Sequence, residues 1–276
     1  QPVSTGAKDG QAPLPIGNLV FKLVTNLFLL LLLVLLGGVL GAMVFYVRWD
    51  EFVASILDPE SLFALKLTAI CVTASTALCL VVGIPVAYAL SRQQVPLGIV
   101  VDTIIDLPLV LPQLIAGIAL LMFFQTSLGV WIETHIMGFV YRTPGIVLAI
   151  FFPTVSLAVR SMKAAFDGVD RRYEQVARTL GCTETQAFWK VSLPLARTGL
   201  VAGTVLTWAY SLGAFGSILM FAGATRYKTT VVPIAIFLNM TTGKITAGLS
   251  LTIVLLALAV ISLFAFKRLG GRATIA

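Results

Sequence analysis

Charged side chains are scarce in this sequence. Asp, Glu, Lys and Arg make up only 11% of the 276 residues, whereas 58% are hydrophobic, and the mean hydropathy is +0.99. A water-exposed surface needs more charged groups than this, so the composition excludes a soluble globular protein. The apolar segments are long and continuous and do not alternate with period two, which favours helices over a barrel as the membrane-spanning elements.

Histidine and cysteine are rarer still. The single histidine, His135, and the three cysteines form no cluster with metal-ligand spacing, and no nucleophile has an obvious base. Cys71 and Cys79 lie about 12 Å apart along one predicted helix, too far for a disulfide between them. We therefore expect no metal site, no catalytic site and no cofactor in this chain, and we expect that it is not an enzyme.

Six long runs with few or no charges predict six transmembrane helices. The runs are 23–47, 67–91, 107–132, 143–159, 198–225 and 245–266. The fourth is short for a crossing and contains Pro153, so we expect a kink there. The first is too long for a cleaved secretory signal, and we interpret residues 19–47 as a membrane anchor. The predicted fold class is all-α, a polytopic membrane helical bundle.

The basic residues indicate the orientation, because Lys and Arg accumulate in loops on the cytoplasmic side. With the N-terminus inside, twelve basic residues fall in inside segments and six in outside segments, with Lys22 ambiguous. We expect a multi-pass protein of the plasma or inner membrane with both termini cytoplasmic, in the polar tails 1–18 and 267–276. The net charge of +7 follows mostly from this topology and requires no nucleic-acid partner.

The longest predicted cytoplasmic loop, residues 160–197, is unusually polar for this chain. Asp170 can cap a first helix there, and Gly181 stands where a left-handed residue would end it. One apolar stripe recurs along that helix at helical spacing, formed by Tyr173, Val176, Ala177 and Leu180. Such a stripe has to be buried, either against a partner or against the bundle of the chain itself, and the periodicity leaves both open.

A second short helix is predicted directly after the first. Thr183 and Gln186 have the spacing of a capping box, which opens this helix, and Pro194 is expected to end it. The loop is thus predicted as two short helices that meet at a glycine.

This two-helix loop resembles the cytoplasmic signature of permease subunits of ABC importers, E-A-A-x3-G-x9-I-x-L-P. Gln175, Val176 and Ala177 occupy its first three positions, with Gln175 in place of the glutamate and Glu174 just before it. The remaining positions follow with the same spacing at Gly181, Val191, Leu193 and Pro194.

The resemblance extends over about residues 60–266. The segments "DLPLVLPQLIAGIALL" from Asp106, "TPGIVLAIFFPTVSLAVRSMKAAFDGVD" from Thr143 and "LTWAYSLGAFGSILMFAG" from Leu206 look like those of the molybdate/tungstate permease subfamily and its relatives for sulfate. We therefore expect residues 60–266 to form the permease core.

The resemblance implies a type I importer. Two copies of this chain would associate with two cytoplasmic ATPase subunits and with an extracytoplasmic binding protein that delivers the anion. The ATPase would bind ATP and Mg, since this chain has no phosphate-binding glycine loop with its lysine. The ATPase-coupling residues that the resemblance implies are Glu174, Gln175, Val176, Ala177, Arg178, Leu180, Gly181, Thr183, Phe188, Leu193 and Pro194.

Polar but uncharged side chains in the spans are candidates for the translocation pathway, because an anion can also leave such groups. They are Gln113, Thr204, Thr207, Tyr210, Ser211 and Ser217. The alternative is interhelical hydrogen bonding, the commoner role of Ser and Thr in membrane helices. Asp102 and Asp106 stand at the cytoplasmic start of the third run, so no ionisable group lies well inside the later spans. This disfavours a secondary transporter acting alone.

The outside loop before the last run is basic. Arg226, Lys228 and Lys244 occur there without an acid, and they form either an ordinary surface loop or a positive rim that receives an anion or the binding protein. The segment "VVPIAIFLNM" between them predicts a short re-entrant or interfacial helix broken by Pro233. The leading functional prediction is a molybdate or tungstate ABC permease, and the alternative is a permease for sulfate or another solute.

Overall fold

The computed structural model describes residues 16–92 and 98–270. Every regular element in these two ranges is a helix, which confirms the predicted all-α class. Most of the predicted tails 1–18 and 267–276 lies outside the described residues. The chain divides into two compact units, Gln1–Val47 and Arg48–Ala276.

The described part of the first unit is dominated by one long helix, α1 (Ile16–Phe45). Its segment Val20–Phe45 is long and apolar enough to cross a membrane. Large apolar side chains are exposed all along this segment. A helix that is apolar on every side needs a lipid or protein environment, so α1 has the properties of the predicted membrane anchor.

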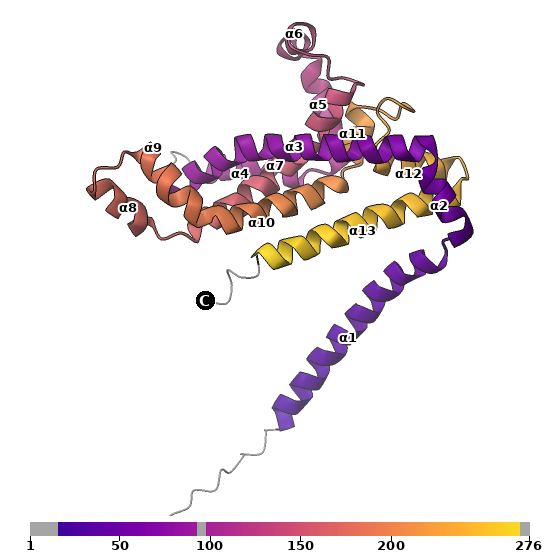
Figure 1. Ribbon diagram of the computed structural model, residues 1–276, viewed down its shortest axis with the longest axis horizontal. Coiled ribbons are helices and arrows are strands. Elements are labelled where there is room, and N and C mark those ends of the chain that lie inside the picture. The colour runs from indigo at the N-terminus through magenta and orange to yellow at the C-terminus, as the bar shows by residue number, and fades with distance from the viewer. Residues whose placement is uncertain (1–15, 93–97, 271–276) are drawn as a thin grey trace, which may run out of the picture. The chain divides into compact units, whose positions relative to one another are not determined.

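Four long helices run side by side in the second unit and form its bundle (Figure 1). They are α3 (Pro59–Arg92), α7 (Thr143–Asp167), α10 (Leu193–Leu212) and α13 (Ile245–Gly270). At one end of the bundle lie α2 (Trp49–Leu57) and α12 (Val232–Thr241), and at the other end lie α8 (Arg171–Thr179) and α9 (Glu184–Ala187). The bundle therefore separates the basic outside loop from the two-helix loop.

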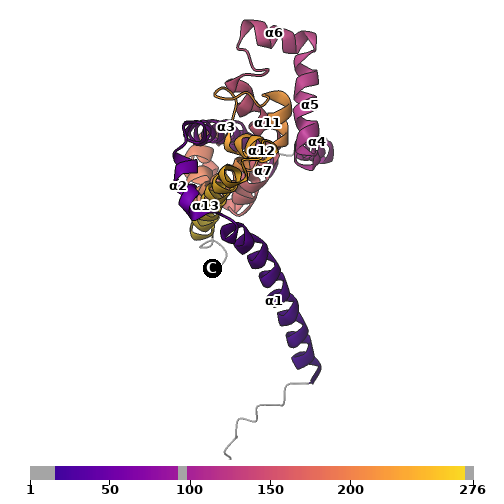
Figure 2. The same cartoon turned by 90° about the vertical axis from the view of Figure 1, so that its right-hand side faces the viewer.

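Three shorter helices fill the third predicted run, which we expected to be a single span. They are α4 (Gly98–Val110), α5 (Gln113–Phe124) and α6 (Ser127–His135). The axes of α4 and α5 are bent by 111° at the break between them. Pro112 lies in that break, where it lacks a backbone N–H and disfavours helical geometry at Leu111. In Figure 2, α5 and α6 rise beside the bundle.

The fifth predicted run is also interrupted. α10 ends at Leu212, and α11 (Gly216–Phe221) begins after a short break. Within the described residues, four helices are individually long and apolar enough to span a membrane, or five spans if α4 and α5 together count as one. α10 has the length but is less apolar, because it contains Arg197 and several hydroxyl groups.

The fourth predicted run is longer than expected, and one prediction about a proline needs correction. α7 continues without interruption through Pro153 and ends at Asp167, well beyond the predicted end at residue 159. Pro233 does not break the helix predicted around it, because it lies in the first turn of α12. A proline in the first turn breaks no intrahelical hydrogen bond, since the N–H groups there have no helical partner.

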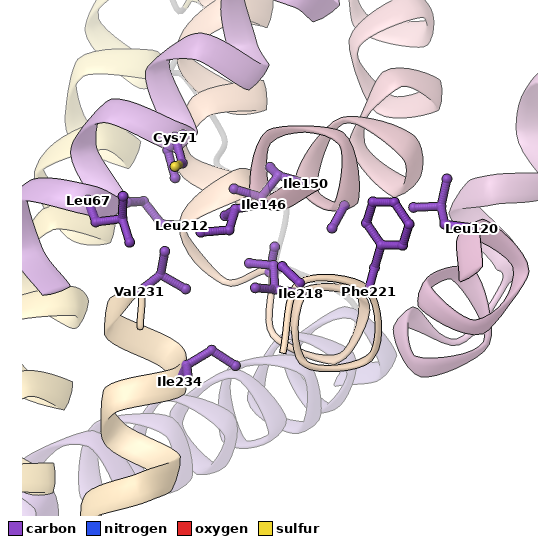
Figure 3. Packing of buried hydrophobic residues seen from close by; sticks show 14 of the residues in the cluster. Leu67, Cys71, Leu120, Ile146, Ile150, Leu212, Ile218, Phe221, Val231 and Ile234 are labelled. Atoms are coloured by element: carbon purple, nitrogen blue, oxygen red, sulfur yellow. The ribbon is translucent and has the colours of Figure 1, made fainter. Parts of the chain in front are cut away.

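The largest apolar core joins the bundle to the shorter helices. Figure 3 shows Cys71 of α3, Ile146 and Ile150 of α7, and Phe221 of α11 converging in this core. The contact between α5 and α11 is close, because a Cβ atom on Gly117 would lie only 2.7 Å from the carbonyl oxygen of Ser217. The two helix breaks are therefore packed against each other.

Candidate functional site

The first helix of the two-helix loop forms as predicted. The Asp170 side chain caps α8 by accepting a hydrogen bond from the backbone N–H of Arg172. Gly181 follows with φ = +94°, the left-handed conformation that glycine adopts without steric strain. The backbone N–H of Cys182 then donates to the carbonyl of Ala177 at 3.0 Å, which closes the helix end.

The second helix begins as predicted but does not end where we expected. Thr183 and Gln186 form both hydrogen bonds of the capping box, at 3.2 and 3.1 Å. After α9 a π-helical turn, η1 (Phe188–Ser192), leads directly into α10. Pro194 lies in the first turn of α10 and does not end the helix, because the wider π turn before it accommodates the change in backbone hydrogen bonding.

The apolar stripe of α8 is exposed. Tyr173, Val176 and Leu180 have 60%, 57% and 81% of their surfaces accessible. They line a groove of about 630 Å³ together with Asp170, Arg172, Ala177 and Val191. The stripe is therefore not packed against the bundle of the chain itself, which was the alternative that the sequence left open.

The opposite face of the loop is anchored to the bundle. The Phe188 ring packs edge-on against Tyr88 of α3, with centroids 4.7 Å apart, and it also contacts Phe166 of α7. Leu193 packs against the same apolar cluster. Of the residues that the family signature predicts for coupling, Phe188 and Leu193 thus hold the loop in place, and the α8 stripe faces outward.

Glu174 is the most strongly engaged acid of the loop. Its carboxylate accepts hydrogen bonds from Arg92 Nε at 2.6 Å, from Ser192 Oγ at 2.6 Å and from the Tyr88 hydroxyl at 3.3 Å. The side chains of Arg92 and Glu174 are only 7% and 13% exposed. Sequence reasoning missed Arg92, Tyr88 and Ser192, because the local pattern links Glu174 neither to α3 nor to the turn that follows α9.

Gln175 and Arg178 face a second cavity, of about 490 Å³, between the loop and α3. Arg178 pairs with Glu184 across the turn at 3.1 Å, in an exposed position. A glutamate in place of Gln175 would face Arg171 and Arg178 in this cavity. The substitution of the signature glutamate therefore leaves a polar side chain at a polar position.

The predicted pathway residues are only partly brought together. The hydroxyls of Thr204, Thr207 and Ser211 donate to carbonyls of their own helix, four residues earlier. Tyr210 is 37% exposed. These four residues give α10 a polar character without forming a shared anion site in the described residues.

Gln113 and Ser217 lie at the two packed helix breaks. The Gln113 side-chain oxygen accepts a hydrogen bond from the backbone N–H of Phe215 at 3.1 Å. The Ser217 hydroxyl is buried without a hydrogen-bond partner in the described part of the chain. Gln113 therefore serves first to stabilise the break before α11.

The predicted positive rim is partly neutralised. Arg226 forms an ion pair with Glu60 at 3.3 Å, between their Nε and Oε1 atoms. Lys244 lines a cavity of about 290 Å³ together with Glu51, Asp58 and Glu60. Acids from the start of the second unit thus lie beside these two bases, although the loop itself has none. Lys228 contributes its backbone carbonyl to the Thr143 hydroxyl.

Asp102 and Asp106 also have a basic partner. Arg160 of α7 donates from Nε to Asp106 Oδ1 at 2.6 Å and forms a second bond with Asp106 Oδ2. Its Nη1 lies 3.5 Å from Asp102 Oδ1. These contacts, with the bond of Ser156 Oγ to the Ile105 carbonyl, hold α4 against α7.

The sequence of this chain is similar to sequences of known transport proteins. A family model described as "Binding-protein-dependent transport system inner membrane component" matches residues 79–274. The molybdenum transport system permease protein ModB of Mycobacterium tuberculosis is 38% identical over 225 residues, which cover 80% of this chain and 85% of that protein. The sulfate transport system permease protein CysT of Escherichia coli is 30% identical over 248 residues, which cover 89% and 90%.

A solved structure has the same fold. It is a chain of the bacterial alginate ABC transporter in complex with alginate pentasaccharide-bound periplasmic protein. The TM-score is 0.67, with 94% of this chain and 96% of that chain covered. The identity of 18% limits this likeness to the fold.

Proposed function

The chain belongs to the family of inner membrane components of binding-protein-dependent transport systems, and from this premise we propose that it is the permease subunit of an ATP-driven importer for an oxyanion, molybdate or tungstate. It is accordingly an integral inner membrane protein. The observation that carries the proposal is the exposed apolar groove on α8, presented at one end of the bundle by a loop with the family spacing.

The groove fits a protein partner in the cytoplasm. Complete burial of one large apolar side chain is worth about 1.5–3 kcal/mol, and three such side chains are exposed side by side on α8. The matching partner is the ATPase subunit, which binds ATP and Mg and hydrolyses the nucleotide. This chain then contributes a docking surface and no catalytic group.

The complete importer would contain two copies of this chain, two ATPase subunits and an extracytoplasmic binding protein. Both termini and the two-helix loop would face the cytoplasm. Closure of the ATPase subunits would displace the docked loops, and the rigid bundles would move with them between inward-open and outward-open states. Asp102 and Asp106 are paired with Arg160, which agrees with an energy source outside this chain.

The substrate assignment is supported by the identity of the relatives. The molybdenum permease ModB is more similar in sequence than the sulfate permease CysT, but the latter matches over a larger share of this chain. Sulfate is therefore the second candidate. Molybdate and sulfate are both tetrahedral oxyanions, and the external binding protein would provide most of the discrimination between them.

The test is reconstitution of this chain with its ATPase and binding protein in proteoliposomes. We expect ATP-dependent uptake of molybdate or tungstate that sulfate in excess does not abolish. Uptake of sulfate alone would transfer the assignment to the second candidate. Uptake by this chain without the ATPase would overturn the proposal.

Docking can be tested separately by co-purification. Ala177→Arg places a long charged side chain in the groove, so we expect the ATPase to be lost from the purified complex. Thr179→Arg adds the same charge to the same helix but outside the groove lining, and it serves as the matched control. Equal retention of the ATPase by both variants would contradict docking at the groove.

A further inference from the structure

A polar network lies at the base of the two-helix loop, on the face opposite the groove. It joins the last turns of α3 to α7, α8 and η1. We call it the base network, and its members are Tyr88, Ser91, Arg92, Asp167, Arg171, Glu174 and Ser192.

The centre of the base network is the buried ion pair of Arg92 and Glu174. Burial of two charges is unfavourable unless other hydrogen bonds satisfy both groups. Glu174 accepts from three donors, and Arg92 also donates from Nη2 to the carbonyl of Val169 at 2.8 Å. The pair therefore fixes α8 and η1 in one geometry relative to the end of α3.

Neighbouring contacts strengthen the same junction. Ser91 donates to Asp167 of α7 at 2.6 Å, and Arg171 of α8 donates to the backbone carbonyl of Ser91. Lys163 also donates to Asp167, at 2.8 Å. The last turn of α3 is thus bonded to α7 and to α8 at once.

The cavity beside the base network is part of a polar junction between helices and not a free anion site. Three arginines line it, namely Arg92, Arg171 and Arg178. Each already has an acceptor within the chain, respectively Glu174, the Ser91 carbonyl and Glu184. The arrangement is that of a structural junction, in which the arginines connect elements.

α3 extends from this junction to the other end of the bundle. Its 34 residues correspond to about 51 Å at the helical rise of 1.5 Å per residue. Glu60 in its first turn pairs with Arg226, and about two turns further on the Thr68 hydroxyl accepts from the backbone N–H of Val232 in α12. One continuous helix therefore connects the two-helix loop with the segment around α12.

We infer that Arg92 and Glu174 are positioning residues that join the two-helix loop rigidly to α3, so that displacement of this loop reaches the opposite end of the bundle. This inference rests on the proposed function, because it assumes that an ATPase displaces the loop. Glu174 then has the positioning role inside the protein, whereas Gln175, at the signature position, faces the adjacent cavity. The junction transmits motion, whereas the groove on α8 receives it.

The variants that test this are Glu174→Gln, Arg92→Gln and the two combined. Each single change leaves one buried charge without its partner, whereas the double variant leaves two neutral groups that can still hydrogen-bond. Glu184→Gln is the matched control, because it removes an exposed ion pair from the same loop.

The first readout is independent of transport. Cys182 on the loop is partly exposed, whereas Cys71 and Cys79 are buried, so a nitroxide spin label will attach selectively at Cys182. We expect higher label mobility in both single variants of the full-length permease, and mobility near that of the wild type in the double variant. Unchanged mobility in the single variants would overturn the rigid junction.

The second readout is the number of ATP molecules hydrolysed per anion imported by the assembled complex. We expect this ratio to rise severalfold in the single variants, to return toward the wild-type value in the double variant, and to stay at the wild-type value in Glu184→Gln. A merely structural role would lower the yield and thermal stability of the complex without changing the ratio of the complexes that assemble, and that result would overturn the inference.

The two readouts separate this inference from the proposed function. If the wild-type complex imports no oxyanion, the proposed function fails, and the spin-label mobility still decides whether the junction is rigid. If the wild type transports and the single variants keep both its ratio and its label mobility, the inference alone fails.

Discussion

Thr68 of α3 and Val232 of α12 are joined by a buried hydrogen bond. The Thr68 hydroxyl accepts from the Val232 backbone N–H at 2.8 Å and donates to the carbonyl of Ala64 at 2.6 Å. The N–H groups in the first turn of a helix have no intrahelical partner, and this one is buried away from water. A side chain from another helix thus completes the start of α12.

We predict that Thr68→Val destabilises the protein, because the valine fills the same space but leaves the Val232 N–H unsatisfied. A buried donor without a partner costs about 1–3 kcal/mol. Thermal unfolding in detergent can be followed with a thiol-reactive dye, since Cys71 and Cys79 are buried in the folded protein, and Cys182 reacts first and gives a constant background. Thr103→Val is the control, because that exposed hydroxyl only donates to its own helix. Equal melting temperatures of the two variants would refute the role of Thr68.

The parts of the structure that the sequence predicted correctly depend on neighbours in the chain. The Asp170 cap, the left-handed Gly181 and the capping box of Thr183 and Gln186 each involve residues a few positions apart. Their hydrogen bonds are determined by local backbone geometry, which a short sequence pattern encodes. The exposed face of α8 was also recognisable from its helical periodicity, although the pattern did not identify what covers it.

The parts that the sequence did not predict depend on long-range packing. Arg92 and Glu174 are 82 positions apart, and no local pattern assigns one to the other. The break between α10 and α11 was hidden in an apolar run, because its stability comes from the Gln113 side chain of another helix. Hydropathy measures the length of an apolar run and does not detect a break whose polar backbone groups are satisfied within the protein.

Gly117 allows α5 and α11 to pack closely, so we predict that Gly117→Ala is destabilising. The added Cβ would lie 2.7 Å from the Ser217 carbonyl oxygen and 2.8 Å from the Met220 Cβ, so the helices would have to separate. Overpacking of this kind costs about 1–3 kcal/mol. Gly98→Ala is the matched control, since nothing lies within 4 Å of its added Cβ. Thermal unfolding of the two variants makes the comparison, and equal stability would contradict the close approach.

Arg160 is held more closely by Asp106 than by Asp102, and we predict unequal effects of neutralising the two acids. Asp106 accepts two hydrogen bonds from the guanidinium, whereas Asp102 lies 3.5 Å away. The side chains are 35–42% exposed, so solvent screens the pairs, and we expect Asp106→Asn to cost about 1 kcal/mol and Asp102→Asn less. Denaturant unfolding of the purified variants measures the difference. A larger loss in Asp102→Asn would contradict this ranking.

Gln175 and Ala177 lie on different faces of α8, and we predict opposite outcomes for charged substitutions at the two positions. In Gln175→Glu the new carboxylate faces the cavity lined by Arg171 and Arg178, so the variant keeps the wild-type ratio of ATP hydrolysed to anion imported. In Ala177→Arg the charge enters the apolar groove and prevents docking, so the added ATPase hydrolyses nucleotide without import of the anion. Measurement of both activities in proteoliposomes distinguishes them. Equal coupling in the two variants would show that the faces of α8 do not divide the internal junction from the docking surface.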